Sequence, residues 1–156
     1  MTLTRIGSCG YNALDIAEYI IKYEDSCDEL INNLKLQKIL YFLQAQFIVT
    51  TGKTLFNDEL IAWDCGPLVK SVWNEYKRYG CASIFLNKKH MRNNYIHSEH
   101  RELIEEFLEY IRPYSSTYLV GICHNQTPWK NARIRWNNVI DPYELLDYFH
   151  NDEDLR

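Results

Sequence analysis

The sequence lacks an excess of basic residues. It has 17 lysines and arginines against 21 aspartates and glutamates, which gives a formal net charge of -4 and an isoelectric point of about 5.7. Proteins whose main task is to hold nucleic-acid phosphates are usually basic. A nucleic-acid-binding role is therefore disfavoured, and it would depend on local basic clusters at residues 88–92 or 133–136.

Paired cysteines and long apolar runs are also missing. The five cysteines are an odd number without a Cys-x-x-Cys pair, and residues 1–8 contain one basic residue and no apolar core of a secretory signal. This usage is typical of reduced thiols in the cytoplasm, where we expect the protein to reside. The longest apolar stretch, residues 39–49, is too short and too rich in glutamine to span a membrane, so we expect no membrane segment.

Signatures of catalysis and metal binding are scarce. The chain has only six glycines, and no glycine cluster follows a predicted strand, which excludes a phosphate-binding loop. His97 and His100 form a close pair without further ligands at metal spacing. Cys123 and His124 are adjacent on a predicted helix, where neighbouring side chains point apart. We therefore predict no enzyme activity, no cofactor and no metal site.

Apolar material is plentiful, at 46% hydrophobic and 14% aromatic residues, and there is no internal repeat, linker or low-complexity tract. The sequence predicts a mainly α fold: a single domain over residues 1–156 with a short charged tail from about residue 150, about six or seven helices and at most a small two-stranded β-ribbon. The predicted helices cover residues 14–21, 33–51, 67–79, 99–111, 116–122, 127–129 and 142–149, and short extended pieces cover residues 59–63 and 83–86.

Individual residues mark where several of these helices begin and end. Asn12, Asn32 or Asn33, and Ser115 or Ser116 are expected caps. Residues 141–144 carry a capping box with proline in the first turn, and the Gly66-Pro67 pair is expected to begin another helix. Gly52 is expected to end the second helix in a left-handed conformation.

The segment at residues 32–52 is the most informative part of the chain. It is apolar nearly all round a helix, yet it contains Gln37, Gln44 and Gln46. A buried amide must be hydrogen-bonded, so this is either a central helix with a polar network or a helix that presents one face to a partner. We expect Lys35 and Lys38 to face outward, and the core positions to be Leu34, Ile39, Leu40 and Leu43.

The four tryptophans are expected to be core anchors, with Gln37 and Gln44 as possible acceptors for an indole N–H. This structural use of the amides competes with a partner-binding use. Arg133, Arg135 and Trp136 form a cluster whose composition is enriched at protein interfaces, although it fits the rim of a core equally well.

Four stretches, at residues 17–20, 33–56, 62–80 and 124–129, resemble the Panacea domain, the SocA-like antitoxin family of bacteria and phages. Cys65 replaces the aromatic residue usual before the Gly-Pro pair, Cys123 stands where threonine is common, and residues 112–114 replace the usual Tyr-Gly pair. The motif positions that the resemblance implies to be structural are Asn33, Leu34, Leu36, Gln37, Tyr41, Trp63, Gly66, Pro67, His124 and Pro128.

The resemblance implies a non-enzymatic antitoxin that neutralises a cognate toxin, usually encoded by the neighbouring gene, through direct protein contact. Two alternatives stay open: a phage or mobile-element adaptor that delivers a client to a host protease, and a small nucleic-acid-binding regulator. The oligomeric state is left open. The partner-binding residues expected from exposed motif positions are Lys35, Lys38, Lys70, Lys77, Trp129 and Lys130.

Overall fold

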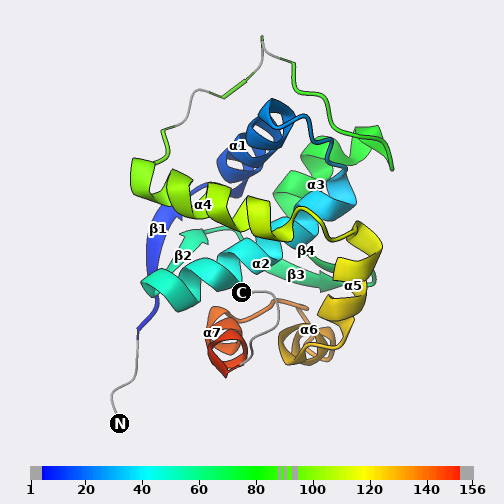
Figure 1. Cartoon of the computed structure of the whole chain (residues 1–156). Helices are drawn as coiled ribbons and strands as arrows, with labels where there is room; N and C mark the ends of the chain where they lie inside the picture. Colours follow the sequence, from blue (N-terminus) through cyan, green and yellow to red (C-terminus); the bar gives the residue numbers. More distant parts are fainter. Residues whose placement is uncertain (1–4, 88, 90, 93–94, 152–156) are drawn as a thin grey trace.

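The computed structural model describes residues 5–87, 89, 91–92 and 95–151. Parts of the basic run at residues 88–92 and most of the charged tail lie outside the described residues. The mainly α class is confirmed (Figure 1). The elements in chain order are β1 (Gly7–Tyr11), α1 (Ala13–Ser26), α2 (Asn33–Thr51), β2 (Lys53–Phe56), β3 (Leu60–Trp63), β4 (Gly66–Val69), α3 (Lys70–Tyr76), the 3-10 helix η1 (Lys77–Tyr79), α4 (Ser98–Ile111), α5 (Ser116–His124), α6 (Thr127–Arg133) and α7 (Pro142–Asn151).

The strands form two small sheets, where the sequence led us to expect at most one. β3 and β4 form an antiparallel hairpin, and β1 pairs in parallel with β2 in a separate sheet. β2 follows α2 directly because Gly52 adopts the expected left-handed conformation, with φ of 72°, at the end of the helix. β1 carries no alternating apolar pattern, so its pairing with a segment more than 40 residues away has no local signal.

Helix α2 lies at the centre of the fold, with helices and both sheets arranged around it (Figure 1). Asn32 is its cap, since the Asn32 Oδ1 atom accepts a hydrogen bond of 2.8 Å from the Lys35 backbone N–H. The expected core positions Ile39, Leu40 and Leu43 are buried, whereas Leu34 is only half-buried. The other expected caps, Asn12 and Ser115, are confirmed by hydrogen bonds from their side chains.

The buried amides of α2 bind the two sheets. Gln44 Oε1 accepts from the backbone N–H groups of Leu55 and Phe56 at 2.7 and 3.2 Å, and its Nε2 donates to Phe56 O at 2.9 Å. Gln37 Oε1 accepts from Val69 N at 2.8 Å, and its Nε2 donates to Asn33 Oδ1 at 2.9 Å. Both side chains therefore satisfy backbone groups of β2 and β4, which confirms the polar network expected inside this helix.

The expectation that Gly66 and Pro67 begin a helix is wrong. These residues open strand β4, and helix α3 begins at Lys70. Gly66 has a φ of +93°, a conformation that favours glycine, and Pro67 pairs with Ala62 across the hairpin. The tertiary contacts of the hairpin thus outweigh the local preference of proline for a first helical turn.

The tryptophans are not core anchors. None of the four belongs to the buried core; Trp63 and Trp136 are exposed, and Trp73 and Trp129 are half-buried. The expected use of Gln37 and Gln44 as indole acceptors is also wrong, because the oxygens of both amides accept from backbone N–H groups of β2 and β4 instead. None of the helices among the described residues is long and apolar enough to cross a membrane.

Candidate partner-binding groove

A groove of about 400 Å³ lies between the β3–β4 hairpin and helix α3. Trp63 and Trp73 meet in it edge to face, with ring centroids 5.8 Å apart and an interplanar angle of 73°. Lys70 and Lys77 are exposed and also line it. We call this site the tryptophan groove, and its lining residues are Ile61, Trp63, Leu68, Lys70, Trp73, Asn74 and Lys77.

The chemistry of the tryptophan groove suits a protein segment. Trp63 leaves 47% of its surface exposed, whereas the neighbouring Leu68 is buried. Aromatic side chains surrounded by polar ones are typical of the centres of protein interfaces. Because both charged residues of the lining are lysines, the groove favours a partner that offers an apolar side chain beside carboxylates.

Helix α6 and the end of α5 hold the hairpin from outside. Trp129 Nε1 donates to Trp63 O at 2.9 Å, and His124 Nε2 donates to Asp64 O at 2.7 Å. The rings of His124 and Trp129 lie 4.4 Å apart. Arg133 adds a 2.6 Å ion pair with Asp64 and stands over the Trp129 ring. The segment around His124 therefore fixes the backbone that carries Trp63, which is a structural role.

Lys38 holds the same hairpin from inside. The expectation that Lys38 faces outward is wrong, because only 1% of this residue is exposed. Its Nζ atom donates to Pro67 O at 2.7 Å, and burial lowers the pKa of the amine to about 8. A Cβ atom at Gly66 would lie 3.1 Å from Lys38 Cε and Nζ, so the glycine makes room for the buried amine.

The elements that build this arrangement coincide with a known family. The family model "Antitoxin SocA-like, Panacea domain" matches residues 36–130, which include most of α2, the hairpin, α3 and the start of α6. The chain belongs to this family. Antitoxin SocA of Caulobacter vibrioides (strain NA1000 / CB15N) is 33% identical over 69 residues, which are 44% of this chain and 37% of that antitoxin. The chain thus matches well under half the length of this relative. No solved structure matches the chain.

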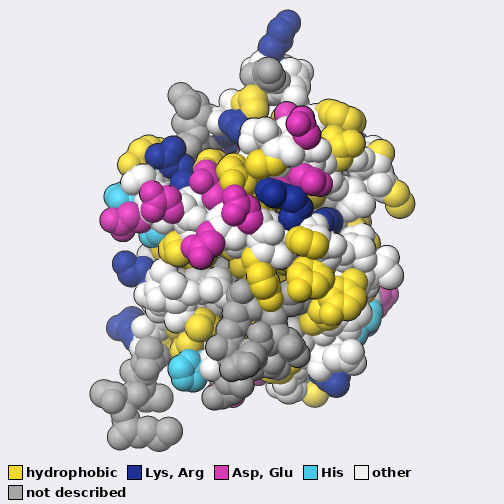
Figure 2. All heavy atoms as spheres, viewed as in Figure 1, with side chains coloured by type: hydrophobic (Ala, Val, Ile, Leu, Met, Phe, Trp, Pro, Cys, Tyr) yellow, Lys and Arg dark blue, Asp and Glu magenta, His cyan; other side chains and the backbone are white. Residues whose placement is uncertain are grey.

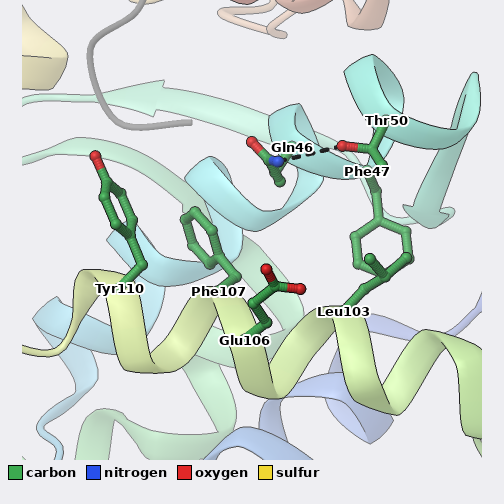
Figure 3. A pocket seen from close by; sticks show the side chains of 7 residues that line it. All are labelled: Gln46, Phe47, Thr50, Leu103, Glu106, Phe107 and Tyr110. Carbon is green, nitrogen blue, oxygen red and sulfur yellow. Dashed lines mark hydrogen bonds between the residues drawn. The ribbon is translucent and has the colours of Figure 1, made fainter.

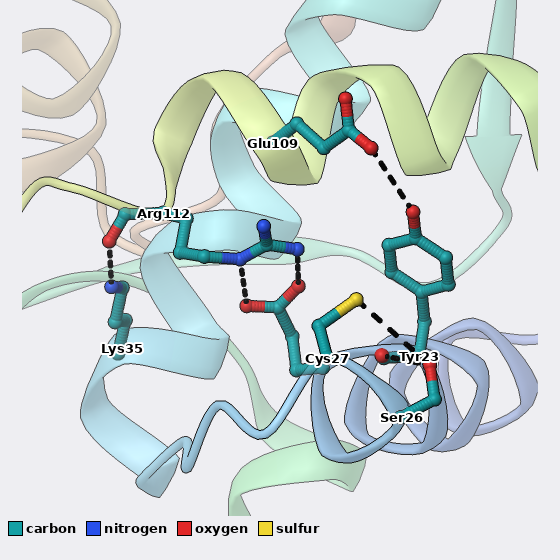
Figure 4. A network of polar contacts seen from close by, with 7 residues as sticks. Tyr23, Ser26, Cys27, Lys35, Glu109 and Arg112 are labelled. Atoms are coloured by element: carbon teal, nitrogen blue, oxygen red, sulfur yellow. Dashed lines mark hydrogen bonds and ion pairs between the residues drawn. The ribbon is translucent and has the colours of Figure 1, made fainter.

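Lys35 of this Panacea-family chain is engaged in a polar network rather than displayed (Figure 4). Its Nζ atom donates to Arg112 O at 2.7 Å, at the carboxyl end of α4. Arg112 in turn donates twice to the buried Glu24 carboxylate, at 2.8 and 3.1 Å, and this pairing raises the pKa of the guanidinium. Arg112 thereby joins α1, α2 and α4.

The structure therefore divides the expected partner-binding residues. It brings Lys70 and Lys77 together at the tryptophan groove, and it places Trp129 against the outer side of the hairpin, with Lys130 exposed beside it on α6. Lys35 and Lys38 take structural places elsewhere. Sequence reasoning missed Trp73 as a lining residue, although its spacing from Lys70 and Lys77 places all three on one helical face.

The other candidate residues have structural partners. His100 Nδ1 lies 2.7 Å from the Tyr11 hydroxyl, and the rings of His97 and His100 are 5.7 Å apart. Within the described residues, no group of three or more His, Cys, Asp or Glu side chains is arranged to hold a metal ion. Cys123 is buried, and burial raises the pKa of its thiol to about 12, so it is protonated at neutral pH.

Proposed function

We propose that this chain is a cytoplasmic antitoxin that neutralises a cognate protein toxin by direct binding, without a catalytic step of its own. Membership of the SocA-like antitoxin family carries this proposal, because the matched residues 36–130 include the elements that build the tryptophan groove. We also propose that residues 1–156 act as one Panacea domain.

The tryptophan groove is the proposed contact site. A side chain of the toxin would pack against the open edge of Trp63 and Trp73, while toxin carboxylates pair with Lys70 and Lys77. Neither lysine takes part in an ion pair found among the described residues, so both are available to a partner. Because α6 and Lys38 already hold the hairpin in place, binding of the toxin at this site would cost little conformational entropy.

Coexpression with the product of the neighbouring open reading frame tests the proposal. We expect that product to stop growth when expressed alone, and we expect this chain to restore growth and to co-purify with it. A product that is harmless alone and forms no complex would contradict the proposal. Measuring the half-life of the toxin after translation is blocked distinguishes direct neutralisation from delivery to a protease. Direct neutralisation leaves the half-life unchanged, whereas delivery to a protease shortens it.

A further inference from the structure

A second groove, with the opposite charge, lies between α2 and α4 (Figure 3). It has a volume of about 290 Å³, well above the roughly 30 Å³ share of one water molecule, so it has room for a side chain. We call it the α2–α4 groove. Its lining residues are Gln46, Phe47, Thr50, Leu103, Glu106, Phe107 and Tyr110.

Two residues that line this groove, Gln46 and Glu106, carry oxygen atoms that can accept hydrogen bonds from a ligand. Gln46 Oε1 is buried and has no hydrogen-bond partner in the described part of the chain, while Gln46 Nε2 donates to Thr50 Oγ1 at 3.2 Å. An unpaired buried acceptor is unfavourable and calls for an explanation such as a ligand. Glu106 is exposed, and none of the ion pairs among the described residues uses it. Figure 3 shows its carboxylate rising from α4 between Leu103 and Phe107.

The surroundings add negative charge and aromatic rings. Acidic side chains gather over α4 in Figure 2. That helix contains five glutamates, at positions 99, 102, 105, 106 and 109, and Arg101 is its only lysine or arginine. Phe107 and Tyr110 line the groove. The Tyr110 ring contacts the Tyr114 ring, and Tyr114 stacks on Tyr118 with ring centroids 5.3 Å apart. Carboxylate, amide oxygen and aromatic faces together favour a cationic donor.

Arginine fits this set better than lysine. A guanidinium is planar and presents several N–H donors in a fixed fork, so it can donate to two acceptors while its face packs on a ring. We propose that the α2–α4 groove binds an arginine side chain from a protein partner, which donates to the exposed Glu106 carboxylate and, once the Gln46 amide turns toward the groove, to the unpaired Gln46 Oε1. This site is independent of the tryptophan groove, whose charged residues are lysines and which therefore selects carboxylates.

A peptide titration of the full chain tests the inference. The probe is acetyl-Leu-Arg-Leu-amide, compared with the same peptide carrying lysine or the neutral isostere citrulline. Binding is followed in nitrogen-15 NMR spectra up to about 10 mM peptide, a concentration that covers weak single-anchor contacts. We expect saturable shifts of the Gln46 side-chain amide and of Thr50 and Phe107. The lysine and citrulline peptides should bind about tenfold more weakly, because they lack the charged fork.

Matched variants on one helix complete the test. E106Q should weaken arginine-peptide binding about tenfold, whereas E102Q, at an exposed position on the same helix, should keep the affinity within about twofold. Spectra of both variants without peptide report that the fold is intact. Equal binding of the three peptides, equal effects of the two variants, shifts spread over all acidic residues or no saturable shift would each overturn the inference.

Discussion

The buried amine of Lys38 should make the stability of the protein depend on pH in a way that is unusual for a lysine. The side chain is fully enclosed, and its Nζ atom donates to Pro67 O at 2.7 Å. Burial lowers the pKa of the amine from 10.5 to about 8. The perturbation we choose is Lys38→Met, which keeps an unbranched side chain of similar reach and removes the titrating group.

The sign and size of the effect follow from proton linkage. Below pH 8 the amine is charged in both states, so the folded protein bears the full cost of burying it. Between pH 8 and 10.5 the unfolded chain binds more protons at Lys38 than the folded protein does, so the free energy of unfolding rises with pH. This interval corresponds to about 3 kcal/mol, since one pKa unit is about 1.4 kcal/mol.

Urea unfolding of the wild-type protein and of K38M over this pH range measures the effect. The free energy of unfolding of the wild type relative to K38M should increase by about 3 kcal/mol between pH 8 and 10.5. Ionisation of groups distant from Lys38 occurs in both proteins and largely cancels in the difference. The Cys123 thiol interacts with the Lys38 amine, but burial raises its pKa to about 12, so it stays protonated in the folded protein over this pH range. The exposed Lys130→Met change is the control and should give a constant difference. An equally flat difference for K38M would refute the reasoning.

Three further substitutions probe the contacts that hold the two sheets and α4, each measured by urea unfolding. Gly66→Ala should cost about 2 kcal/mol because of its positive φ and its contact with the buried amine, whereas Gly121→Ala, in open space on α5, should be neutral or slightly stabilising. Gln44→Leu should cost about 2–3 kcal/mol and speed amide exchange in β2, because it leaves three backbone groups unpaired; unchanged exchange would contradict this. Arg112→Met should cost roughly 3 kcal/mol by stranding the buried Glu24 carboxylate, and adding Glu24→Leu should recover most of the loss.

Helix α2 shows which features the sequence could predict. Its ends depend on local chemistry, the Asn32 cap and the left-handed Gly52, and both were expected. Its polar interior also followed from the sequence, because buried amides such as Gln37 and Gln44 require partners. The identity of those partners did not follow, since strands β2 and β4 come together only in the folded chain.

The errors arise where tertiary contacts override residue preferences. Lysine is almost always exposed, and nothing local to Lys38 shows that the Pro67 carbonyl and the space at Gly66 can accept its amine. Tryptophan is usually expected in a core, yet Trp63 lies on a short hairpin whose backbone, rather than side chain, is held by α6. Of the residues that line the tryptophan groove, only those on the α3 side could have been predicted to lie together, because their helical spacing is regular.

The affinity of the toxin for variants of the tryptophan groove tests the central claim most directly. With the neighbouring-gene toxin, K70E/K77E should weaken binding at least about tenfold and abolish the rescue of growth, because two attractive charges become repulsive. W63A should weaken binding by a similar factor through loss of the aromatic anchor. K53E, a charge reversal at an exposed site on β2 outside the groove, should bind as the wild type does. Wild-type affinity and full neutralisation by both K70E/K77E and W63A would contradict the account.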